Sequence, residues 1–287
     1  MFRRLSGGRA DPAEMSTSPG ATPRSSTPAR SSVLARRVLN KVPEVTIFFW
    51  VIKVLCTTVG QSAADYVAGT LGFGLADTAK VCGAVLAVLL LAQFRLDRYV
   101  PLAYWAVVVA VSVFGTLMAE LLTDAHGAAP AVVTALFAAG LGLVFAAWWA
   151  VERTLSLRTI VTVRREAFYW AAVVLAFALG CAAGDVVVEN AGLGYAVSIA
   201  IFGGVLALIA VAHRLGADAV LTFWLAFVVT GPLGAAIGDE IARNTHRHSG
   251  LGLGTTGTST IFAAVILALV AYLTVTHRDR PRTEATA

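Results

Sequence analysis

Eight apolar segments of about 18–22 residues each dominate this chain, and a helix of that length matches a bilayer core roughly 30 Å thick. The segments show no alternation of apolar and polar residues, which argues against a transmembrane β-barrel. A helix also satisfies its own backbone hydrogen bonds in lipid. We therefore expect an all-α membrane protein with spans at about residues 45–67, 76–95, 101–123, 130–150, 167–189, 193–213, 219–241 and 256–277.

The composition agrees with this fold class, because only 14% of the residues are charged, whereas a soluble domain carries roughly a quarter. Cys56, Cys82 and Cys181 lie inside apolar segments without a CxxC pair, so we expect packing residues and no metal site. Residues 1–40 are rich in Ser, Thr, Pro, Gly and Arg, which predicts a disordered basic tail. The membrane domain then covers 41–280, and a short tail covers 281–287.

The basic residues predict the orientation of the chain. Lys and Arg gather in the two tails and in the loops that hold Arg95, Arg98, Arg153, Arg158, Arg164, Arg165 and Arg214. The opposite loops hold only Arg243 and Arg247. The positive-inside rule therefore predicts a multi-pass protein of the inner (plasma) membrane with both termini in the cytoplasm. The formal charge of +5 comes mostly from the tails and from the loops on one side. It therefore indicates orientation, and we expect no nucleic-acid partner.

One pattern recurs four times: an aromatic residue and a tryptophan, a glycine ten residues after the tryptophan, and an acid fifteen residues after it. The aromatic pairs are Phe49-Trp50, Tyr104-Trp105, Tyr169-Trp170 and Phe223-Trp224; the glycines are Gly60, Gly115, Gly180 and Gly234; the acids are Asp65, Glu120, Asp185 and Asp239. The copies cover about residues 45–99, 100–155, 165–218 and 219–280, so each contains two spans.

Because each copy crosses the membrane twice, all four enter it in the same direction and form parallel repeats. The simplest arrangements are a pseudo-four-fold ring or a pair of pairs, with the first helix of each repeat facing a common centre. The repeat glycines predict close helix packing. The aromatic pairs begin each first helix at the cytoplasmic side, which favours anchoring or packing over ligand stacking.

The repeat acids are the main candidates for function, since an ionisable group within a span normally faces a partner or a water-filled cavity. Thr57, Thr58 and Gln61 share one stripe of the first helix with Asp65, and Thr116 shares a stripe with Glu120. Stacked hydroxyl, amide and carboxylate oxygens suit a hard cation or a proton relay. An interfacial or capping role remains the alternative, because each acid lies near the predicted outer loop.

A lysine inside the first span is the second candidate. An ammonium in the membrane is costly without a partner, so Lys53 should pair with a carboxylate or act as a coupling group, and Glu44 is one candidate partner. In the seventh span we expect the helix to break near Gly231-Pro232. His246 and His248 lie in an exposed loop, where solvation is more common than metal binding. No motif predicts a nucleophile, a phosphate cradle or a cofactor, so we expect no enzyme activity.

The first repeat resembles that of a known bacterial family. The matching residues are Lys41-Val-Pro-Glu-Val-Thr46, Phe49-Trp50, Ile52-Lys53, Thr57-Thr58-Val-Gly60 and Asp65. Members are described only as uncharacterised membrane-anchored proteins with four tandem two-span, Trp-containing repeats, so the resemblance implies the eight-span fold and no particular activity. The family pattern often places an acid where this chain has Gln61.

These observations predict a transporter of a small solute or cation, with the lipid bilayer as its environment and the repeat acids along a polar pathway. The alternative is a non-transporting scaffold or sensor, in which the acids form structural bonds between helices. The sequence leaves the substrate and the oligomeric state open.

Overall fold

The computed structural model describes residues 41–70, 72, 74–157, 160–190, 192, 194–242, 254–276 and 278–279. The predicted tails at 1–40 and 281–287 lie outside these ranges. The described residues fold into α2 (Ile47–Asp65), α3 (Gly74–Phe94), α4 (Pro101–Glu120), α5 (Pro130–Glu152), α6 (Val163–Asp185), α7 (Gly194–Arg214), α8 (Ala219–Ala242) and α9 (Gly254–Thr276). All eight helices are long and apolar enough to cross a membrane, which confirms the predicted fold class.

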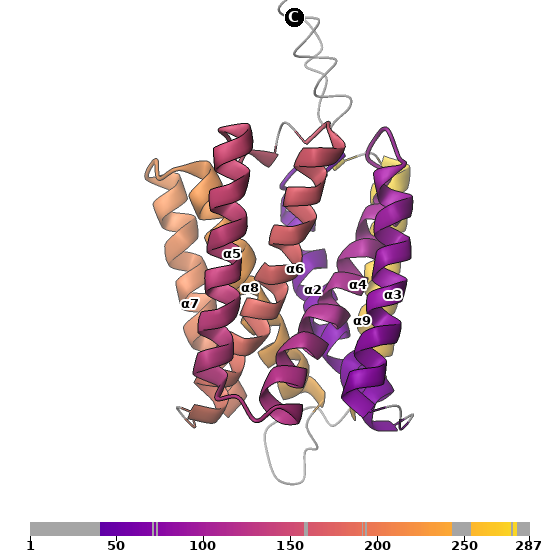
Figure 1. Ribbon diagram of the computed structural model, residues 1–287, viewed down its shortest axis with the longest axis vertical. Helices are drawn as coiled ribbons and strands as arrows, with labels where there is room; N and C mark the ends of the chain where they lie inside the picture. Colours follow the sequence, from indigo (N-terminus) through magenta and orange to yellow (C-terminus); the bar gives the residue numbers. More distant parts are fainter. Residues whose placement is uncertain are drawn as a thin grey trace, which may run out of the picture.

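The first helices of the four repeats form a closed inner ring. Helix α2 contacts α4, α4 contacts α6, α6 contacts α8, and α8 contacts α2 (Figure 1). In these four helices 44–61% of the span residues are buried, against 6–22% in the second helices of the repeats. The described residues therefore form a pseudo-four-fold bundle, with an outer layer that exposes large apolar side chains on its surface.

Each outer helix packs mainly on the inner helix of the following repeat. Helix α3 packs on α4, α5 on α6, α7 on α8, and α9 returns to α2. The second helix of each repeat therefore packs on the next repeat, and the second helix of the last repeat packs on the first repeat. A single repeat cannot bury its apolar face alone, so the four copies fold as one unit.

The repeat glycines lie where neighbouring inner helices cross. A Cβ atom on Gly60 would lie 2.0 Å from Ser112 Oγ of α4, and one on Gly234 would lie 2.7 Å from the Val54 carbonyl oxygen of α2. Gly115 faces Phe177 of α6 in the same way, and Gly180 faces Gly231 of α8. The predicted packing role of these glycines therefore has a direct geometric basis: a side chain would clash at Gly60 and Gly234 and would be tightly packed at Gly115 and Gly180.

The aromatic pairs form a second ring, nearer the Arg-rich end of the bundle. The first aromatic of each repeat contacts the tryptophan of the next: Phe49 with Trp105, Tyr104 with Trp170, Tyr169 with Trp224, and Phe223 with Trp50, at centroid separations of 5.4–6.1 Å. Trp105, Trp170 and Trp224 are buried, so they pack in the core. The hydroxyls of Tyr104 and Tyr169 form a hydrogen bond of 2.5 Å inside this ring.

A buried polar network ties the chain together at the Arg-rich end. Lys41, just before α2, forms an ion pair of 2.9 Å with Glu166 at the start of α6. Its ammonium also donates to the Phe94 carbonyl, and Gln93 donates to the Glu166 carboxylate. Both charged side chains are almost fully buried, at 6% and 1% exposure. The network therefore joins three segments that are far apart in the sequence.

A second buried contact at this end joins the α3–α4 connection to the segment after α9. The Tyr99 hydroxyl donates to Asp279 Oδ2 over 2.6 Å, and the Glu44 amide donates to the Asp279 carbonyl. Burial, and then the neighbouring Asp279 carboxylate, raise the pKa of Tyr99, so the phenol stays protonated and remains the donor. The described segments before α2 and after α9 thus meet at one end of the bundle.

The predicted break in the seventh span is wrong. Helix α8 runs without interruption from Ala219 to Ala242 with Pro232 inside it. Proline removes one backbone hydrogen bond, but neighbouring helices can compensate for this in a membrane bundle. Here Pro232 packs against Gly180 and Gly184 of α6, whose missing side chains leave room for its ring.

Candidate functional site

The repeat acids lie at the same point of their helices, opposite the Arg-rich end. In the first three repeats the α-helix ends at the acid and continues as a π-helical turn: η1 (Tyr66–Thr70), η2 (Leu121–Ala125) and η4 (Val186–Asn190). π-turns occur frequently at functional sites. Two further acidic positions, Asp124 and Glu189, lie in these helical extensions.

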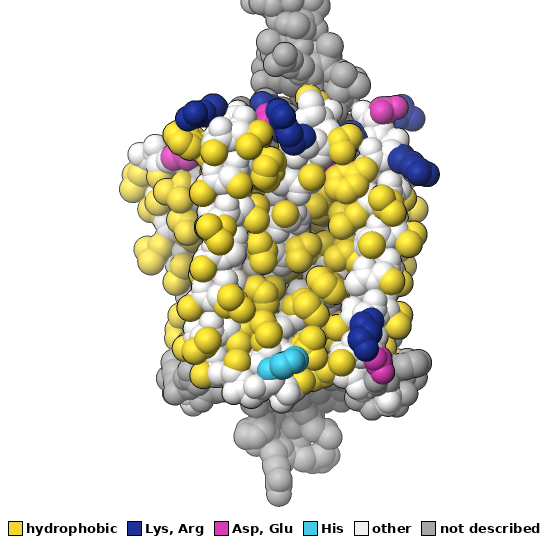
Figure 2. Space-filling model, viewed as in Figure 1, with side chains coloured by type: hydrophobic (Ala, Val, Ile, Leu, Met, Phe, Trp, Pro, Cys, Tyr) yellow, Lys and Arg dark blue, Asp and Glu magenta, His cyan; other side chains and the backbone are white. Residues whose placement is uncertain are grey.

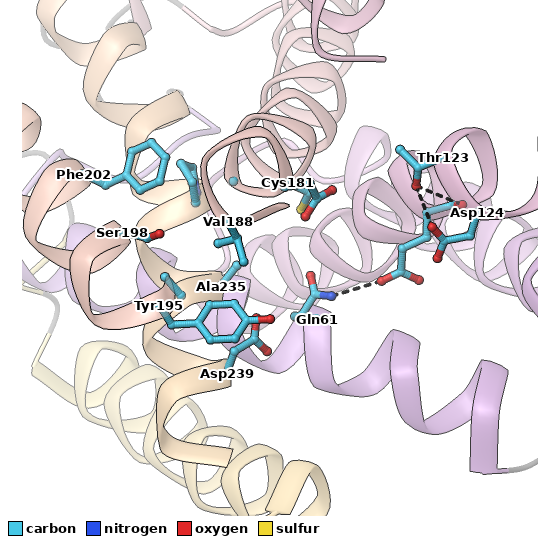
Figure 3. Close-up of a pocket in the computed structure, with 15 residues that line it drawn as sticks. Gln61, Thr123, Asp124, Cys181, Val188, Tyr195, Ser198, Phe202, Ala235 and Asp239 are labelled. Atoms are coloured by element: carbon cyan, nitrogen blue, oxygen red, sulfur yellow. Dashed lines mark hydrogen bonds between the residues drawn. The ribbon is translucent and has the colours of Figure 1, made fainter. Parts of the chain in front are cut away.

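Three of the four repeat acids line one cavity. Glu120, Asp185 and Asp239 border a space of about 220 Å³ at this end of the inner ring, and all three are half-buried. We call this space the acidic cavity (Figure 3). Its wall is completed by Gln61, Thr123, Asp124, Cys181, Gly184, Val188, Tyr195, Ser198, Phe202, Pro232, Ala235 and Ala236. The acids of three separate repeats thus converge on one space.

The first repeat contributes an amide to this cavity. Gln61 donates from Nε2 to Glu120 Oε1 over 3.0 Å, which links α2 to α4 (Figure 3). The neighbouring Thr123 hydroxyl donates to Asp124 over 3.1 Å. The backbone of Asp65 ends α2, but its side chain lies outside the described part of the structure. Its predicted place beside the other acids therefore stays a prediction.

The candidate threonines lie beside the cavity but not in its wall. Thr57 donates to the Lys53 carbonyl, and Thr58 donates across to the Gly234 carbonyl of α8 over 2.6 Å. Thr116 contacts Cys181 Sγ of α6 at 3.3 Å. All three are buried. The Thr58 and Thr116 hydroxyls thus join neighbouring inner helices, whereas the Thr57 hydroxyl bonds within α2.

Lys53 lies on the bundle axis between the cavity and the aromatic ring. Its Nζ donates to the Phe227 carbonyl of α8 over 2.7 Å. The same atom lies 4.6 Å from the ring centroids of both Phe177 and Phe227. The side chain is 1% exposed. Among the described residues it forms no ion pair, so a carbonyl and two aromatic faces replace the predicted carboxylate partner.

The position of Lys53 along α2 follows from the geometry of an α-helix. Lys53, Thr57 and Gln61 are spaced four residues apart, which places them on one face of α2. On α6, Phe177, Cys181 and Asp185 follow the same spacing. Lys53 therefore lies about 12 Å along the helix axis from the level of Gln61, at 1.5 Å per residue.

Sequence reasoning missed the residues that α7 supplies. Tyr195, Ser198 and Phe202 line the cavity, yet the second helices carry no repeated acid that would single them out. Cys181 was expected to be a packing residue but also borders the cavity. Glu166 was overlooked because the predicted span began at residue 167. The loop with His246 and His248 lies outside the described residues.

The sequence comparisons agree with the repeat. A family model, the Repeat of Unknown Function (DUF347), matches residues 48–99, 103–154, 168–215 and 222–279. No curated protein and no solved structure matches the chain. Each matched segment covers one pair of membrane-spanning helices, which confirms four tandem repeats. The chain therefore belongs to the DUF347 repeat family, as an eight-span helical protein with four copies of the repeat.

Proposed function

We propose that this protein transports a small cationic solute, which binds in the acidic cavity. The observation that carries the proposal is the convergence of Glu120, Asp185 and Asp239, from three repeats, on one cavity within the inner ring. Carboxylates inside a membrane domain are costly unless they face partners or water, and they commonly mark ion and substrate pathways. The role involves binding and translocation without covalent chemistry.

The distribution of charge supports the proposed orientation. Figure 2 shows most Lys and Arg side chains of this face at one end, with a broad apolar belt below them. The segments before α2 and after α9 meet at that end, through Glu44 and Asp279. We propose that this end faces the cytoplasm and that the acidic cavity faces the outside of the plasma membrane.

The arrangement also suggests a transport state. The acidic cavity is open, whereas Lys53, Phe177 and Phe227 fill the bundle between the cavity and the aromatic ring. The aromatic ring, with its Tyr104–Tyr169 hydrogen bond, closes the bundle further on. We propose that this is a state with its binding site towards the outside and its cytoplasmic half closed, as alternating access requires.

The close packing at the Arg-rich end also suits one alternative function. A packed aromatic ring and the Gln61–Glu120 hydrogen bond also suit a scaffold or sensor that carries no solute. The two functions differ in flux: a transporter moves a solute across a sealed membrane, whereas a scaffold does not.

Flux in proteoliposomes therefore tests the proposal. We expect the purified full-length chain to move at least one cation from a panel of organic and inorganic cations. Glu120→Gln, Asp185→Asn and Asp239→Asn should each lower that flux by roughly tenfold or more, since a hydrogen bond to a charged group contributes about 1.5–3 kcal/mol.

Asp77→Asn is the matched control, because Asp77 lies at the same end but is exposed and paired with Lys80. Its flux should equal that of the unmodified chain. Flux that persists in all three cavity variants would remove the acids from the mechanism. No flux of any cation tested would favour the scaffold.

A further inference from the structure

The size and wall of the acidic cavity bear on the kind of cation it holds. Its volume of about 220 Å³ far exceeds the roughly 10–15 Å³ that one water molecule needs. A bare divalent ion instead requires several oxygens within roughly 2.0–2.6 Å of one point. Here the carboxylates come from three helices arranged around an open space (Figure 3). The cavity thus has room for an ion with a carbon skeleton.

One wall of the cavity is aromatic. Helix α7 places the Tyr195 and Phe202 rings in it, on the side of Asp239 and Ala235 (Figure 3). Aromatic faces attract organic ammonium groups, because the ring quadrupole is negative above and below its plane. Carboxylates and aromatic rings around one space are a combination that recognises an organic cation by both its charge and its apolar part.

The bundle already holds one alkylammonium on the same axis. Lys53 Nζ is bound by the Phe227 carbonyl and by the faces of Phe177 and Phe227, each at 4.6 Å. Phe177 lies one helical turn from Cys181, which borders the cavity. The interior of the inner ring thus accommodates a primary amine with no carboxylate of the described residues paired to it, and the acidic cavity adds carboxylates to the same kind of aromatic setting.

We infer that the acidic cavity binds a small protonated organic amine, with its ammonium at the repeat acids and its carbon chain against Tyr195 and Phe202. This inference rests on the proposed function and specifies its substrate class. The carboxylates supply charge recognition, and the two rings select against a hydrated metal ion, which offers them no apolar surface.

Binding and flux of radiolabelled putrescine and methylammonium, compared with Mg²⁺ and Mn²⁺, test the inference on the purified full-length chain. We expect saturable putrescine or methylammonium binding that Asp239→Asn weakens by tenfold or more. The double variant Tyr195→Leu/Phe202→Leu should weaken amine binding by roughly fivefold or more, since each cation–π contact contributes about 0.5–1 kcal/mol.

One control separates a lost ring from a misfolded chain. Tyr272→Leu removes an aromatic side chain on α9, which takes no part in the cavity wall, and should bind amines like the unmodified chain. Each variant is compared by its elution profile in size-exclusion chromatography before binding is measured.

The outcomes distinguish the inference from the proposed function. Acid-dependent flux of Mg²⁺ or Mn²⁺ without amine binding would overturn the inference and leave cation transport standing. Amine binding that is unchanged in the Tyr195→Leu/Phe202→Leu variant would also overturn the inference. The absence of acid-dependent binding and flux for every cation would overturn both.

Discussion

Replacing Lys53 with methionine is expected to tighten cation binding in the acidic cavity by about tenfold. When its amine is protonated, Lys53 is a buried positive charge about 12 Å along α2 from the level of Gln61. Two unit charges at that distance repel by about 1.4 kcal/mol at an effective dielectric constant of about 20, which equals a factor of ten in binding. Methionine keeps a similar shape and removes the charge.

The same substitution should not lower the melting temperature in detergent. A buried ammonium with no anionic partner costs free energy, and an apolar replacement of similar size removes that cost. Lys80→Met is the matched control, because Lys80 is exposed at the outer end and paired with Asp77. It should change cation affinity by less than a factor of two. A Lys53→Met variant that binds cations as weakly as before, or more weakly, would show that the charge of Lys53 does not repel a cation in the acidic cavity.

Replacing Glu166 with glutamine is expected to destabilise the chain by about 3–5 kcal/mol, the usual cost of leaving one member of a buried ion pair alone. The variant leaves the Lys41 ammonium with the Phe94 carbonyl and a neutral amide in place of the carboxylate. Thermal unfolding in detergent, followed by tryptophan fluorescence, measures the effect.

Two further variants separate charge from packing at this site. Asp77→Asn removes an exposed ion pair and should leave unfolding unchanged, because such pairs contribute little. The double variant Lys41→Met/Glu166→Leu removes both buried charges and should recover most of the loss. If the double variant is as unstable as Glu166→Gln alone, the buried ion pair is not what holds this end together.

The sequence predicts a pseudo-four-fold ring as one of two arrangements, the other being a pair of pairs, because its repeats carry an unusually strict register. Glycines ten residues after each tryptophan predict helix crossings, and the structure places Gly60 and Gly234 at two of them. Acids fifteen residues after each tryptophan predict a common level, and Glu120, Asp185 and Asp239 share one cavity. Equivalent residues in a closed ring of parallel repeats must lie at the same depth, so the register alone determines this much.

The remaining features depend on contacts between elements that the register does not specify. Nothing in the repeat says which neighbour an outer helix packs on, so the position of Tyr195 on α7 in the cavity could not be predicted. Lys53 was expected to pair with a carboxylate, because the Phe227 carbonyl and two aromatic faces become available only when α2, α6 and α8 meet. Pro232 suggested a broken helix, but Gly180 and Gly184 of α6 leave room for its ring, so α8 continues through it.

The proposed function requires that the acidic cavity admit cations from the side opposite the Arg-rich end. Charge-selective labelling of a single cysteine tests this requirement most directly, because it requires no knowledge of the substrate. Ala235 lines the cavity, so Ala235→Cys in a background without Cys56, Cys82 and Cys181 places one thiol in its wall. Ala129→Cys, at an exposed position at the start of α5, is the matched control.

We predict that a positively charged methanethiosulfonate, applied from the side opposite the Arg-rich end, labels Ala235→Cys at least about tenfold faster than a negatively charged one. A cavity lined by charges of one sign concentrates counter-ions to that degree. The two reagents should label Ala129→Cys at similar rates. Equal rates for both reagents at Ala235→Cys, or labelling only from the Arg-rich side, would contradict the entry of cations into the acidic cavity from the opposite side.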